Sequence, residues 1–123
     1  MPRFSPTVPV LAAAFALMTA APAWAGYGAI AYDQQSGHQG AAWNQTTPAK
    51  ANEMALKSCA TDGCRVHPVE PKGCGALARS GTGKAWGGAD RTTVAEAGRT
   101  AILLCEKHTA TGACKVVVQG CNK

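Results

Sequence analysis

The chain has 123 residues, of which 15% are charged, and its 12 Lys and Arg side chains against 7 Asp and Glu give a formal net charge of +5. The basic residues are scattered, with no run of three. This pattern argues against a nucleic-acid-binding surface, which would be denser in charge and interleaved with stacking aromatic side chains.

The first 25 residues have the pattern of a secretory signal peptide. Arg3 supplies a short positive start, Val8 to Ala21 is an almost entirely apolar run, and Ala23-Trp24-Ala25 is an A-x-A cleavage motif. The apolar run is shorter than the roughly 20 residues that a helix needs to cross a bilayer. We therefore expect residues 1–25 to be cleaved before Gly26, leaving no membrane anchor, and the protein to be periplasmic or extracellular.

The rest of the chain repeats itself. Thr47 to Cys59 and Thr93 to Cys105 carry Thr, Ala and Cys at equivalent positions, 46 residues apart. The stretch "YGAIAY" matches "CGALAR", 47 residues further on. Because internal repeats fix an architecture, we expect one domain, residues 26–123, made of two repeats that span residues 27–73 and 74–123.

Each repeat predicts the order strand, strand, helix, strand. Gly-rich stretches mark the turns between the first two strands. Two such units predict an α+β fold in which helices cover an antiparallel or mixed sheet, with a pseudo-two-fold between the units. The expected strands are Gly28–Tyr32, Ala41–Asn44 and Cys64–Val69 in the first repeat, and Gly75–Arg79, Ala85–Ala89 and Cys114–Gln119 in the second.

The two predicted helices have clear starts. Thr47 is followed by Pro48, which suits the first helical position, and Thr93 with Glu96 has the spacing of a capping box. Small residues then recur at i, i+4 spacing, which places them on one face. This face should allow close approach to a sheet or to the other helix. Its residues are Ala51 and Ala55 in the first helix, and Ala97 and Ala101 in the second.

All six cysteines follow residue 25, and in an exported domain of this size they predict a disulfide framework. Free thiols or a metal site are the alternative, which an oxidising compartment disfavours. Bonding that respects the repeat must join at least one cysteine to its own counterpart, and short turns separate the other cysteines. The expected bonds are Cys59–Cys64, Cys105–Cys114 and Cys74–Cys121.

The whole of this pattern resembles the bacterial domain of unknown function 4189. The resemblance is carried by "YGAIAY", an Ala-rich helix ending in Cys, "GCRV", "CGALA", a second Ala-rich helix and "CKVVVQGC". It implies an exported bacterial protein. It implies no catalytic residues, because no general activity is assigned to the family.

Three histidines, His38, His67 and His108, are the candidates for chemistry. Phosphate chemistry of the ribonuclease type needs a general acid, a general base and a cation at one point. His67 with Arg65 and Glu70 could supply these groups. On an ideal strand, however, Arg65 and His67 share a face and Glu70 points to the other, so polar residues on an edge strand are the simpler interpretation.

Other motifs are weak. Cys64 and His67 have a zinc-like spacing without a second pair, and "GTGKAWGG" lacks the spacing of a phosphate-binding loop and predicts a hairpin turn. We expect no metal and no cofactor. Trp43 and Trp86 would be binding anchors if exposed, but a domain this small favours both in its core.

These observations favour a small exported binding module, not an enzyme, whose partner is a protein or an envelope component. An inhibitor that uses the Gly-rich loop Gly37 to Gly40 would be a special case. The alternative is a small basic secreted hydrolase that acts on RNA or cell-wall material, with His67 or His38 essential.

Overall fold

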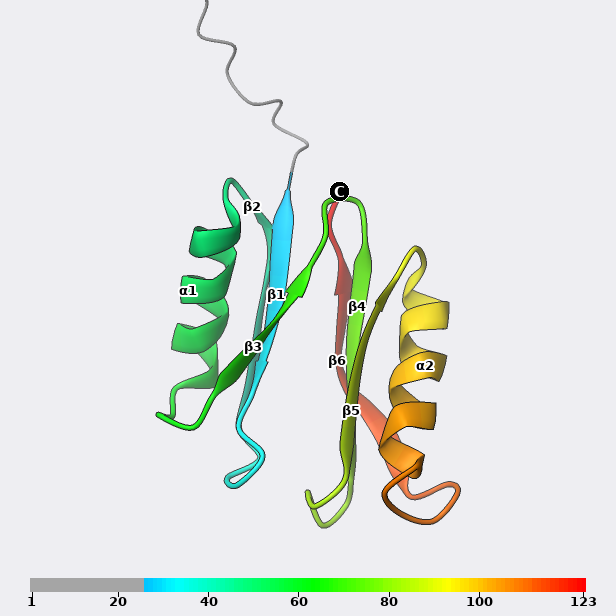
Figure 1. Ribbon diagram of the computed structural model, residues 1–123. Helices are drawn as coiled ribbons and strands as arrows, with labels where there is room; N and C mark the ends of the chain where they lie inside the picture. The colour runs from blue at the N-terminus through cyan, green and yellow to red at the C-terminus, as the bar shows by residue number, and fades with distance from the viewer. Residues whose placement is uncertain (1–25) are drawn as a thin grey trace, which may run out of the picture.

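The computed structural model describes residues 26–123 (Figure 1). The expected signal peptide, residues 1–25, lies outside the described residues. The expected order of strand, strand, helix, strand is found in both repeats. The elements are β1 (Tyr27–Tyr32), β2 (Gln39–Gln45), α1 (Pro48–Cys59), β3 (Arg65–Val69), β4 (Cys74–Ser80), β5 (Trp86–Arg91), α2 (Val94–Glu106) and β6 (Cys114–Cys121).

Each repeat forms its own antiparallel three-stranded sheet, with strand orders β2-β1-β3 and β5-β4-β6. The two sheets stack face to face, and one helix covers the outer face of each (Figure 1). The alternation of side chains along a strand explains these four layers. In β1, Ala29 and Ala31 pack toward α1, whereas Ile30 and Tyr32 pack between the sheets.

The alanine faces of the helices pack against the sheets, as expected, and not against each other. Ala55 and Ala101 are fully buried. They face glycines at equivalent positions of β2 and β5: a Cβ atom on Gly40 would lie 2.6 Å from the carbonyl oxygen of Ala55, and one on Gly87 would lie 2.5 Å from that of Ala101. Glycine therefore sets how closely each helix approaches its sheet.

Both helices begin at the expected threonines. The hydroxyl of Thr47 accepts a hydrogen bond from the Lys50 N–H at 3.0 Å, and that of Thr93 accepts one from the Glu96 N–H at 3.2 Å. These bonds satisfy donors that a helix leaves free at its start. No helix in the described part of the chain is long and apolar enough to cross a membrane.

Three disulfides join the pairs that the repeat suggested. Cys59–Cys64 and Cys105–Cys114 each tie the end of a helix to the start of the following strand. Cys74–Cys121 joins directly opposed residues of β4 and β6. This third bond lies within the second sheet, so the two sheets are held together by non-covalent packing.

The sheets are packed tightly along one side, where β2 faces β6; we call this the closed side. The indole of Trp43 crosses from β2 into space left by three glycines: Cβ atoms on Gly28, Gly75 and Gly120 would lie 2.9, 3.3 and 2.5 Å from its ring. Trp43 thus lies in the layer between the sheets with Val117 and Val118. Trp43 is partly buried and packs against the buried residues between the sheets, which agrees with the core position that the sequence favoured.

The end of the chain fastens the two repeats to each other. Asn122 is 5% exposed. Its Oδ1 accepts a hydrogen bond from the Asn44 N–H at 2.9 Å, and its Nδ2 donates to the carbonyl oxygens of Val69 and Glu70 at 3.2 and 2.8 Å. The residue after β6 therefore connects to the ends of β2 and β3.

Candidate functional site

A groove of about 390 Å³ opens between the sheets on the side where β3 faces β5, which we call the open side. Comparison with the closed side explains the groove. On the closed side Val118 lies opposite Leu77, whereas on the open side His67, paired with Ile30, holds the corresponding place. A polar side chain thus replaces an apolar one that packs between the sheets on the closed side, and the sheets leave a space here. The groove is lined by Ile30, Tyr32, Asp33, Gln34, Gln35, Gly63, Arg65, Val66, His67, Ala76, Leu77, Trp86 and Gly88.

Trp86 is, with Tyr32, one of the two large aromatic side chains that line this groove. It is 37% exposed, so the expectation that it lies in the core is wrong. Its ring lies 5.5 Å from that of Tyr32, centroid to centroid, with an interplanar angle of 52°. The equivalent position in the first repeat is Gln39, a polar residue, and this difference between the repeats is the sequence signal for an exposed tryptophan.

Two basic side chains of β3 line the groove. Arg65 and His67 share this face, as the strand alternation suggested, and both are exposed. Glu70 follows the strand and does not line the groove; its backbone carbonyl accepts the bond from Asn122. The acid, base and cation considered from sequence are therefore not assembled at one point.

The remaining histidines lie elsewhere. His38 is exposed in the β1–β2 hairpin, and His108 is exposed after α2. Cys64, the possible partner of His67 in a metal site, is bonded to Cys59. Within residues 26–123, no three His, Cys, Asp or Glu side chains lie close enough together to hold a metal ion.

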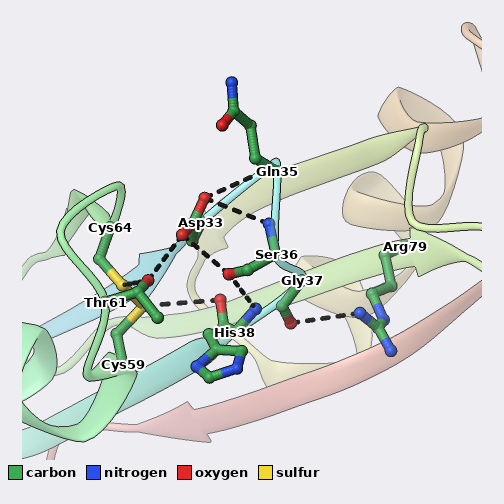
Figure 2. Close-up of a disulfide and its surroundings, with 9 residues drawn as sticks. All are labelled: Asp33, Gln35, Ser36, Gly37, His38, Cys59, Thr61, Cys64 and Arg79. Carbon is green, nitrogen blue, oxygen red and sulfur yellow. Dashed lines mark hydrogen bonds between the residues drawn. A yellow bond between two sulfur atoms is a disulfide. The ribbon is translucent and has the colours of Figure 1, made fainter.

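Asp33 lies at one end of the groove and was not predicted from the sequence as a site residue. It is 6% exposed and accepts hydrogen bonds from the hydroxyls of Thr61 (2.6 Å) and Ser36 (2.8 Å) and from the N–H groups of Gln35 (3.0 Å) and Ser36 (3.4 Å) (Figure 2). An Asp followed by polar turn residues after a strand is the signature of an Asx turn, and this was the available signal.

These hydrogen bonds keep Asp33 ionised. The hydroxyls of Thr61 and Ser36, followed by the backbone N–H groups of Gln35 and Ser36, lower its pKa to about 2, against the opposing effect of burial. Asp33 thus joins the β1–β2 hairpin to the turn closed by the Cys59–Cys64 disulfide (Figure 2). Because its carboxylate oxygens accept these hydrogen bonds, Asp33 holds the two loops in place. It is a poor proton donor.

The low pKa of Asp33 predicts a pH-dependent stability. A carboxyl whose pKa is lower when folded stabilises the protein above its unfolded pKa, about 4, and loses that contribution as the pH falls toward the folded value. We expect urea unfolding to show a loss of stability between about pH 4 and pH 2. Asp33→Asn should be less stable at pH 7 and flatter across this window, unlike Asp62→Asn in the neighbouring exposed turn. Identical pH profiles for Asp33→Asn and the wild type would contradict this role.

A second cavity, of about 610 Å³, lies between the β1–β2 and β4–β5 hairpins. It shares Gln34 and Gln35 with the groove, so the two spaces adjoin. Its basic residues are Lys84, which is exposed, and Arg79, whose Nη1 donates to the Gly37 carbonyl oxygen at 3.2 Å (Figure 2). The segment "GTGKAWGG" forms the β4–β5 hairpin and the start of β5, as predicted.

The loop Gly37 to Gly40, considered as an inhibitory loop, is not free along its whole length. Gly40 is buried in β2 against the end of α1. Gly37 adopts the left-handed φ of 79° that favours glycine. Only the tip of this hairpin, up to Gly37 and His38, is accessible to a partner.

The model of the domain of unknown function DUF4189 matches residues 27–121. The chain belongs to the DUF4189 family. Over 56 residues, 46% of this chain, this DUF4189 protein is 46% identical to the uncharacterised proteins Rv1813c of Mycobacterium tuberculosis and Mb1843c of Mycobacterium bovis. The aligned part spans 38% of the length of those relatives.

The NMR structure of Rv1813c from Mycobacterium tuberculosis is similar to this DUF4189 fold. It matches with a TM-score of 0.58 and 28% sequence identity, covering 98% of this chain and 100% of that chain. The names of these relatives state no activity. The groove and its neighbouring cavity are therefore the basis for a functional proposal.

Proposed function

We propose that this DUF4189 protein is an exported binding module and that its binding surface is the groove on the open side. The observation that carries the proposal is the difference between the two sides of the sandwich. Trp43 fills the closed side, whereas the open side leaves a cavity beside an exposed Trp86. Concave sites with an aromatic wall and a few polar groups are typical of ligand-binding surfaces.

The three disulfides support export, because such bonds persist in oxidising compartments. The signal-peptide pattern of residues 1–25 supports the same location. A rigid, cross-linked fold also favours binding by a preformed surface, since little conformational freedom is lost on association.

The hydrolase alternative receives less support. Of the residues that line the groove, Asp33 is the one carboxylate, and its oxygen atoms accept hydrogen bonds from within the protein. His67 therefore has no free carboxylate in the groove to orient it. An activity on RNA or cell-wall material that is lost in His67→Ala, with the fold intact, would favour the enzyme instead.

The test is a crosslinking capture from native envelope and culture-supernatant fractions with oxidised protein. Gly88→Val should abolish capture, because a Cβ atom at Gly88 meets nothing closer than 3.8 Å and the larger side chain would occupy the groove without displacing the core. Trp86→Ala should weaken capture about tenfold or more, as removal of an aromatic anchor does.

The matched control is Leu103→Ala, which removes an apolar side chain that is 63% exposed on the outer face of α2, away from the groove. It should capture the same partner as the wild type. A partner that Gly88→Val retains in full would bind another surface and would overturn the assignment of the groove.

A further inference from the structure

We propose that the groove and the adjoining cavity bind an acidic peptide segment of a partner protein, with one apolar side chain of that segment placed beside Trp86. This inference rests on the proposed function and specifies its ligand. It follows from the distribution of charge around the two spaces, from their continuity and from the apolar floor of the groove.

The charged side chains around the two spaces are mostly basic. Arg65 lines the groove, and Arg79 and Lys84 line the cavity between the hairpins. Asp33 is the one carboxylate among the lining residues of both, and four hydrogen bonds from within the protein already satisfy it. The lining therefore presents unpaired positive charge, which is complementary to carboxylates.

The polar and apolar parts of the site are adjacent. Gln34 and Gln35 line both spaces and form their boundary. On one side of that boundary Leu77 forms part of a buried floor and Trp86 stands exposed. A ligand that spans the boundary meets apolar surface and Arg65 on one side, and Arg79 and Lys84 on the other.

An acidic peptide with one apolar side chain would complement both the apolar surface and the basic side chains of this site. An apolar side chain would be desolvated against Trp86 and Leu77, which supplies affinity, and neighbouring carboxylates would meet Arg65 and Lys84, which supplies specificity and a faster association. Trp86 packs at an interplanar angle of 52° against Tyr32, so it does not present the open flat platform that a neutral sugar would use.

The experiment is a selection of peptides from a random phage-displayed library on the oxidised wild-type protein, with Gly88→Val as the counter-target. We expect the selected peptides to combine Asp or Glu with one Leu, Phe, Tyr or Trp. The double variant Arg65→Glu/Lys84→Glu should weaken their binding by about tenfold or more. The control Lys50→Glu/Arg99→Glu makes the same change in net charge on exposed helix positions and should change binding by less than about twofold.

Each failure has a distinct meaning. Suppose that the selected peptides lose binding to Gly88→Val but show no excess of Asp or Glu and bind Arg65→Glu/Lys84→Glu as tightly as the wild type. This result would overturn the acidic ligand and leave the groove as the binding site. Saturable binding of chitotriose that changes Trp86 fluorescence, with no peptide enriched, would overturn the peptide ligand in favour of a sugar. Peptides that bind Gly88→Val as well as the wild type would overturn both the ligand and the groove.

Discussion

Gly87→Ala should destabilise the protein by about 3 kcal/mol, because it overpacks the contact between β5 and α2. The new methyl group would lie 2.5 Å from the carbonyl oxygen of Ala101 and from the backbone nitrogen of Cys105. Both are backbone atoms, and the Cys105–Cys114 disulfide restrains the end of the helix. The loss should therefore exceed the gain of about 0.4–1 kcal/mol that alanine brings by restricting the unfolded chain.

The measurement is urea unfolding followed by far-UV circular dichroism, with the disulfides intact. Gly88→Ala is the matched control, since it lies on the same strand but faces the groove, where nothing is closer than 3.8 Å to its Cβ position. It should change stability by less than about 1 kcal/mol. Equal losses for the two alanine variants would show that the close approach of α2 does not depend on glycine.

Trp43→Ala should be the most destabilising of the aromatic substitutions, with a loss of about 3–5 kcal/mol. The indole fills the space over Gly28, Gly75 and Gly120 on the closed side, so its removal leaves a cavity between sheets that no disulfide joins. A Trp43→Ala variant that is already partly unfolded at room temperature would also fit this prediction, because small domains are only marginally stable.

The control for this prediction is Trp86→Ala, measured by the same unfolding experiment. It should lose only about 1–2 kcal/mol, because the side chain is already partly exposed and gives up one aromatic pair with Tyr32. Similar losses at the two tryptophans would mean that the open side contributes to stability as much as the closed side.

Much of the fold was predictable from the repeat. The recurring Thr, Ala and Cys positions gave both helices, with Thr47 and Thr93 as their caps. The stacking of two separate sheets was not predictable, because a strand with small residues on one face and larger ones on the other fits either a single broad sheet or a sandwich. The side chains of Ile30 and Leu77 meet across the layer only in the second arrangement.

The site was harder to predict than the fold. Arg65 and His67 were placed correctly on one face of a strand, but the opposing wall comes from β5, about twenty residues further along the chain. Trp86 was assigned to the core because composition alone cannot say which of two tryptophans is needed there. Asp33 was missed because a buried carboxylate depends on a contact with Thr61 that arises only when the hairpin and the turn meet.

The unequal sides of the sandwich have a consequence for how such a protein can change through evolution. In a dimer of two identical units related by an exact two-fold axis, the two sides of the sandwich would be identical, because the axis exchanges them. Any substitution that opened one side would then open the other. Two units in one chain escape this constraint. Here Trp43 packs the sheets together on the closed side, so residues of the open side can vary without loss of the fold.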